Sequence, residues 1–240
     1  MRYFILLFLC LNVCSFNAQS SINSNVFSGQ MPGMLFQGDA TAVKNVTFEL
    51  LKNSANRTYK KSFKKHEGIV FIKKGSAEIQ TNTFSKTLTP GSIALISQGD
   101  KLKLKSTADN PVEFYLFSYR SISPINQGDT ATSFARVWED LRFNKHERGG
   151  VRSYFSKPTS QTKRFEMHVT TLLGGLPSHP PHTHPAEEII LVIEGETEME
   201  IGGKAFKGVA GDVYFVKSQE PHGIKNTGKN SCSYFAFQWE

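Results

Sequence analysis

The chain has 240 residues, and its 28 Lys and Arg exceed its 21 Asp and Glu, which gives a formal net charge of +7. This length allows two small domains or one large domain. No nucleic-acid-binding motif accompanies the basic residues, so we expect no nucleic-acid partner. No apolar run is long enough to predict a membrane span.

The N-terminal segment, residues 1–18, has one Arg, then an apolar run that ends at Val13, then small and polar residues. This pattern predicts a signal peptide and therefore a periplasmic or secreted protein. A lipid anchor on Cys14 is left open. Cleavage after this segment would leave Cys232 as the only cysteine, so no intramolecular disulfide is expected.

After a polar lead-in at residues 19–40, short apolar runs alternate with turn residues, which is typical of strands. Three segments recur at an offset of 120 residues, which indicates an internal repeat. The matched pairs are 74–79 with 194–199, 90–96 with 210–216, and 113–117 with 233–237. The repeat predicts a first strand-rich unit at 41–120 and a second at 151–240.

The stretch between the two units, residues 121–150, is predicted to be a linker because it contains Pro, Gly and Asn. Within it, Phe134, Val137, Trp138 and Leu141 have helical spacing. This spacing predicts a short helix or turn that packs one unit against the other.

The second unit contains four residues of types that bind metals: His182, His184, Glu188 and His222. Because side chains alternate along a strand, His182 and His184 would face the same way, and Glu188 would return to that face after Pro185. Three imidazoles and one carboxylate suit one divalent transition metal, with Mn, Fe, Ni, Co and Zn all left open.

The spacing of these residues resembles the two motifs of the cupin superfamily. His182, His184, Glu188 and Gly195 match the first motif, and Gly211, His222 and Asn226 match the second. Two positions depart from the pattern, because Gly175 comes one residue early and Lys217–Gln219 replaces the usual Pro-x-Gly. The resemblance implies an all-β fold of two tandem cupin (jelly-roll) barrels with the metal in the second.

The repeat predicts that the first barrel binds no metal. The offset of 120 places Ser62, Lys64, Gly68 and Leu102 where the second unit has its four candidate ligands. Leu102 and a neighbouring leucine, Leu104, would fill the first barrel instead. The first barrel is therefore predicted to be structural.

Other polar residues are candidates for binding a substrate beside the metal. They are Arg164, His168, Tyr214 and Gln238. Gln238 is chosen because Phe235, Phe237 and Trp239 on the opposite face of its strand are expected to form core. His66, His146 and His179 are interpreted as ordinary surface or core residues.

The order of domains, with a signal peptide and a metal in the second barrel, also resembles the (S)-ureidoglycine aminohydrolases. Their metal set differs, with Glu first and Gln in place of the last His, and they have Lys where this chain has Gln238. The resemblance therefore supports the architecture more than the substrate.

Residues 20–125 hold 14 basic and 7 acidic side chains, whereas residues 126–240 hold 13 and 14, so the positive balance lies in the first half. This suits a small anionic substrate. The leading hypothesis is a metal-dependent isomerase, lyase or hydrolase of a small carboxylated substrate such as a sugar acid. An iron or nickel dioxygenase, a non-catalytic binding module and a ureidoglycine aminohydrolase-like enzyme remain alternatives. A homo-oligomer is left open.

Overall fold

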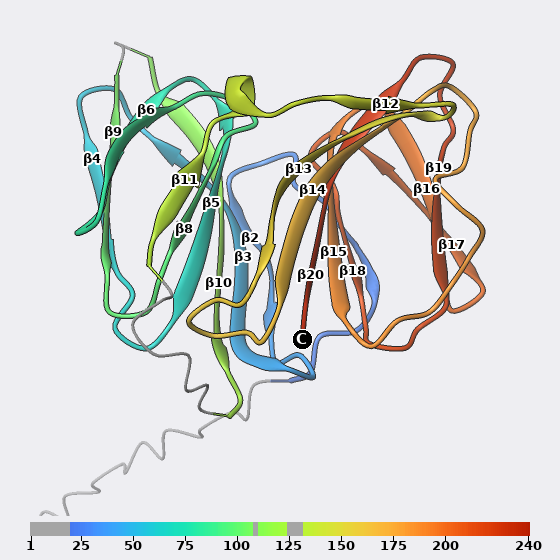
Figure 1. Cartoon of the computed structure of the whole chain (residues 1–240), viewed down its shortest axis with the longest axis horizontal. Coiled ribbons are helices and arrows are strands. Elements are labelled where there is room, and N and C mark those ends of the chain that lie inside the picture. The colour runs from blue at the N-terminus through green and yellow to red at the C-terminus, as the bar shows by residue number, and fades with distance from the viewer. Residues whose placement is uncertain (1–19, 108–109, 124–131) are drawn as a thin grey trace, which may run out of the picture.

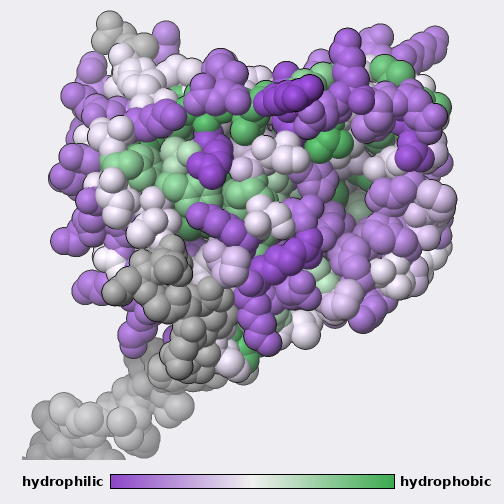
Figure 2. Space-filling model, viewed as in Figure 1, coloured by the Kyte–Doolittle hydropathy of each residue, from purple (hydrophilic) through white to green (hydrophobic). Residues whose placement is uncertain are grey.

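A computed structural model describes residues 20–107, 110–123 and 132–240, so the predicted signal peptide lies outside the described residues. Two β-barrels lie side by side (Figure 1). The described residues contain no helix long and apolar enough to cross a membrane. Hydrophilic side chains cover most of the face seen in Figure 1, and hydrophobic ones gather over the first barrel and toward its junction with the second (Figure 2).

Each barrel pairs a large antiparallel sheet with a small one. The first barrel contains β2 (Gly33–Gly38), β3 (Val43–Asn53), β4 (Thr58–Ser62), β5 (Glu67–Lys74), β6 (Ala77–Gln80), β7 (Ser85–Leu88), β8 (Ile93–Ile96), β9 (Lys101–Ser106), β10 (Val112–Ser121) and β11 (Phe134–Arg136). The second contains β1 (Asn25–Phe27), β12 (Asn144–His146), β13 (Gly149–Lys157), β14 (Phe165–Leu172), β15 (Glu187–Glu194), β16 (Glu196–Ile201), β17 (Lys204–Val209), β18 (Val213–Val216), β19 (His222–Asn226) and β20 (Cys232–Trp239). The all-β prediction is confirmed.

The large sheet of the first barrel has the order β11-β8-β5-β10-β3-β2, and its small sheet has the order β4-β9-β6-β7. The large sheet of the second barrel is β1-β18-β15-β20-β14-β13-β12, and its small sheet is β17-β16-β19. Strands β5 and β15 begin and end at an offset of 120 residues, and so do β8 and β18. The 120-residue repeat therefore describes the structure.

Each barrel receives an edge strand from the segment that precedes the other barrel. Strand β1 pairs with β18 of the second barrel, and β11 pairs with β8 of the first. The polar lead-in is thus built into both barrels, since β2 pairs with β3. The predicted linker helix is reduced to a 3-10 turn at Trp138–Asp140, because Phe134–Arg136 is drawn into the first sheet as a strand. These edge strands cover sheet edges that would otherwise be open to pairing.

Apolar side chains form three groups: one inside each barrel and one between the two large sheets. Strand β20 shows the alternation that creates them. Phe235 and Phe237 point into the group between the barrels, whereas Tyr234 and Ala236 point into the second barrel. The large aromatic area buried between the sheets packs the two barrels against each other.

Candidate metal centre

The segment that carries His182 and His184 is not the regular strand that we predicted. Its counterpart in the first barrel is strand β4, but here only isolated bridges form, one of them between His182 and His222. Four prolines between residues 177 and 185 explain the difference, because proline cannot donate to a strand ladder. Side-chain alternation along a strand is therefore the wrong reason for the convergence of the two histidines.

The histidines nevertheless meet at one point. The ring nitrogens that His182, His184 and His222 offer all lie within 4.8 Å of one another. His222 is delivered by β19, whose first residue it is, and is 2 % exposed. Among the described ranges, this is the one group of three or more such side chains that can hold a metal ion.

Backbone carbonyls set the protonation of two of these rings. Nδ1 of His184 lies 2.9 Å from the Ala186 oxygen, and Nδ1 of His222 lies 2.8 Å from the Glu220 oxygen. A carbonyl oxygen only accepts, so each Nδ1 carries a proton, and the neutral form of each ring presents the lone pair of Nε2. Both Nε2 atoms are buried and have no hydrogen-bond partner in the part of the chain that the structure describes.

Glu188 on β15 lies beside the same nitrogens. Its Oε2 is 3.0 Å from Nε2 of His222 and 3.7 Å from Nε2 of His184. Burial favours the protonated acid, but a cation at the Nε2 atoms of His184 and His222, together with the Gln238 amide, which donates to Oε1 at 3.2 Å, more than offsets it. The pKa of Glu188 therefore lies well below its ordinary value, and the carboxylate is charged.

These residues fit a divalent transition metal. A carboxylate oxygen that faces two nitrogen lone pairs needs a cation between them, either a proton or a metal ion. The donor set of three imidazoles and one carboxylate is one that Zn, Fe, Mn, Co and Ni accept. The carbonyls that hold the Nδ1 protons are the outer partners that metal-binding histidines ordinarily have.

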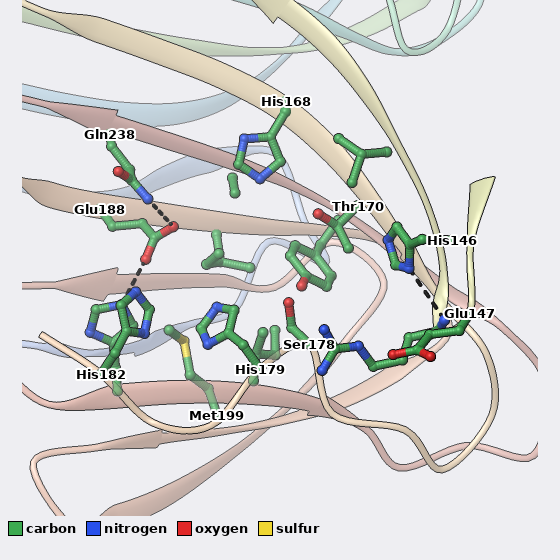
Figure 3. A pocket seen from close by; sticks show the side chains of 17 residues that line it. His146, Glu147, His168, Thr170, Ser178, His179, His182, Glu188, Met199 and Gln238 are labelled. Atoms are coloured by element: carbon green, nitrogen blue, oxygen red, sulfur yellow. Dashed lines mark hydrogen bonds and ion pairs between the residues drawn. The ribbon is translucent and has the colours of Figure 1, made fainter. Parts of the chain in front are cut away.

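His182, His222 and Glu188 line a cavity of about 550 Å³ inside the second barrel. Its wall includes two of the predicted substrate-binding residues, His168 and Gln238 (Figure 3). Nδ1 of His168 is 3.7 Å from Glu166, and burial lowers the pKa of His168 although Glu188 and Glu166 act in the opposite direction. His168 is therefore a neutral imidazole on the wall of the cavity.

Two predicted substrate-binding residues lie elsewhere. Arg164 does not line the cavity, because its guanidinium pairs with Glu166 and Glu240 beside the start of β14. Tyr214 points into the second barrel but away from the cavity, and its hydroxyl shares a hydrogen bond of 2.9 Å with Thr197. Burial raises the pKa of Tyr214 to about 12.

Two histidines that were interpreted from the sequence as ordinary surface or core residues, His146 and His179, line the cavity. The ring of His179 makes an edge contact with that of His182, with 4.3 Å between ring centroids. His146 lies at the far end, in strand β12 (Figure 3). The position of His179, only three residues before His182, could have suggested that it lies near the cluster. No feature of the sequence around His146 predicts its place at the cavity.

The comparisons with known proteins agree with this architecture. Residues 168–237 match the model of the Cupin domain. The second barrel is thus similar to a cupin domain, and the chain has the bicupin fold. No curated protein matches the chain in sequence.

Solved two-barrel structures superpose on nearly the whole chain. Oxalate decarboxylase of Lactobacillus farciminis, in a formate complex, is 14 % identical with a TM-score of 0.70, over 91 % of this chain and 87 % of that one. A mutant of Bacillus subtilis oxalate decarboxylase is 14 % identical with a TM-score of 0.69, over 91 % and 78 %. A putative glyoxylate-induced protein from Pseudomonas aeruginosa is 14 % identical with a TM-score of 0.68, over 90 % and 79 %. At this identity, the likeness concerns the fold.

Proposed function

We propose that this protein is a periplasmic or secreted bicupin enzyme that uses one divalent transition metal to act on a small polar carboxylated substrate, such as a sugar acid. The observation that carries the proposal is the meeting of three histidine nitrogens and the charged Glu188 beside a cavity large enough for such a molecule.

His182, His184, Glu188 and His222 would hold the metal. When bound, it would supply Lewis-acid chemistry, polarising a substrate oxygen or lowering the pKa of a bound water. With four ligands from the protein, a five- or six-coordinate ion keeps one or two positions for carboxylate and hydroxyl oxygens of a substrate.

The protein's own residues prepare the remaining steps. Gln238 donates to Glu188 and holds that carboxylate in one orientation. His168 is neutral, half-buried and backed by Glu166, so it can accept a proton from a substrate that lies across the cavity. Isomerisation, elimination and hydrolysis all need such a base.

The neighbouring folds support the substrate class by analogy alone. Two of them are oxalate decarboxylases, one in complex with formate, so the same fold accommodates small carboxylates.

Elemental analysis of the purified protein tests the metal centre first. We expect one transition metal per chain in the parent and none in His222→Ala, with Lys64→Ala in the first barrel unchanged. Activity on sugar acids and other hydroxy acids should then be measured with and without oxygen. Turnover without oxygen supports the proposal, and turnover that requires oxygen indicates a dioxygenase. Release of ammonia from a ureido acid would indicate the aminohydrolase alternative, and metal without turnover on any substrate would indicate a binding module.

A further inference from the structure

The turn between β12 and β13 brings an arginine into the wall of the cavity. This hairpin belongs to the segment between the barrels, which crosses from the top of the first barrel to the top of the second (Figure 1). Arg148 lies in the turn and lines the cavity together with His146 and Glu147. It is the one Lys or Arg among the described residues that line it.

Backbone contacts fix the position of this turn. The amide of Arg148 donates to Nδ1 of His146 at 3.2 Å, and its carbonyl accepts from the amide of Leu173 at 2.9 Å. Gly149 follows with φ of +142°, and a side chain there would overlap the Thr171 carbonyl oxygen. The close approach of the hairpin to β14 therefore requires glycine, and it holds Arg148 at the cavity without help from a bound molecule.

Among the residues that the structure describes, the guanidinium of Arg148 has no ion-pair partner. Its Nε is buried and unbonded, and within residues 20–107, 110–123 and 132–240 no carboxylate lies within ion-pair distance of it. Arg164 differs, since Glu166 and Glu240 both pair with it. A buried donor without an acceptor is costly, and a ligand oxyanion would remove that cost.

The hairpin that carries Arg148 lies at one end of the cavity, and the histidine cluster lies at the other. Figure 3 shows His146 and Glu147, the neighbours of Arg148 in the hairpin, across the cavity from His182 and Glu188. Glu147 is exposed and makes no ion pair with Arg148. The planar fork of a guanidinium matches a carboxylate in two parallel hydrogen bonds.

We propose that the substrate is an acid with two anionic ends, one held at the metal centre and the second, a carboxylate, held by Arg148. This inference rests on the proposed function and extends it to the substrate class. A monocarboxylate would occupy the metal end alone. A dicarboxylate that spans the cavity would satisfy both ends.

The test is calorimetric titration of the metal-loaded protein with dicarboxylates from malonate to adipate, each beside the monocarboxylate of equal carbon number. We expect the parent to bind at least one dicarboxylate tenfold or more tightly than its monocarboxylate. Arg148→Gln should lose this difference, by roughly ten- to a hundredfold, while its affinity for the monocarboxylate stays the same. Arg148→Lys keeps the positive charge but lacks the planar pair of N–H donors, so it should retain part of the preference for the dicarboxylate.

Lys145→Gln is the matched control, because it removes the same charge from the same hairpin at an exposed position outside the cavity wall. It should behave as the parent does. If the parent binds metal but does not discriminate between the two series, or if Arg148→Gln keeps the discrimination, the inference is wrong and the proposed function stands. If the parent binds no metal, both proposals are wrong.

Discussion

Where the second barrel has the Glu188 carboxylate, the first barrel has Gly68, and a side chain at that position would overlap the ring of Phe63. Phe63 is fully buried inside the first barrel, whereas the corresponding residue of the second, Thr183, is exposed. Leu102, 1 % exposed, takes the place of His222. The first barrel thus fills with hydrocarbon the space that the second keeps polar and open.

The two barrels share the same strands but differ in the side chains that point inward. Strands β5 and β15 have the same length and register, and both are buried over their first six residues. The difference lies in a few inward positions and in the prolines that turn the counterpart of β4 into an irregular segment. One barrel can therefore supply stability while the other tolerates buried polar groups.

The largest effect should come from giving the second barrel a side chain of the first. Glu188→Gly or His222→Leu should abolish stoichiometric metal binding. Loss of Glu188 leaves neutral ligands around a divalent cation in a closed barrel, and loss of His222 removes its most buried donor. Elemental analysis after dialysis measures the effect. Retention of one metal per chain in either variant would show that the cluster is not the metal site.

Phe63→Ala should open a cavity in the first barrel and so make its interior more like that of the second. We expect the free energy of unfolding to fall by about 3–5 kcal/mol, because the ring is fully buried and its removal leaves a void. Urea denaturation measures the loss, and metal content should be unchanged. Thr183→Ala, at the corresponding exposed position, is the control and should cost much less. Equal losses for the two variants would contradict the assignment of Phe63 as the filling of the barrel.

Gln238→Ala removes the hydrogen bond that holds the Glu188 carboxylate in place but leaves all four candidate metal ligands. Its amide donates to Glu188 at 3.2 Å, and loss of such a partner commonly weakens metal affinity by about 10- to 100-fold. Competition with a chromogenic chelator measures this. Ser118, the buried residue at the corresponding position of the first barrel, provides the control, since Ser118→Ala should leave metal affinity at the parental value. A Gln238→Ala protein with parental affinity would show that Glu188 needs no such support.

The smallest effect concerns pH. Burial lowers the pKa of His168 in the folded state, so below about pH 6.5 the unfolded chain binds a proton there that the folded chain does not. The free energy of unfolding of the metal-free protein should therefore decrease as the pH falls below 6.5. In His168→Gln this decrease should be smaller, by up to about 1 kcal/mol per pH unit. Urea midpoints between pH 7.5 and 5 measure both slopes. Identical slopes would mean that His168 does not contribute.

Much of this protein could be predicted from its sequence because the relevant signals are local. The alternation of apolar residues predicted the strands. The gapless repeat predicted which strands of the first barrel correspond to which strands of the second. The alternation along β20 placed Gln238 at the cavity. The spacing of His182, His184 and Glu188 required only a turn and one strand to bring them together. Because these residues are close together in the sequence, their types and spacing suffice to predict that their side chains converge.

Other features depend on contacts between segments far apart in the chain, and only the tertiary structure decided them. The exchange of β1 and β11 between the barrels joins β1 to a strand almost 190 residues later. Which arginine serves the cavity was decided in the same way: Arg164 is drawn to Glu240 at the end of the chain, while the packing of a hairpin from between the barrels on β14 leaves Arg148 unpaired. Side-chain type and spacing carry no information about which partner a charge will find, because that depends on the packing of the whole fold.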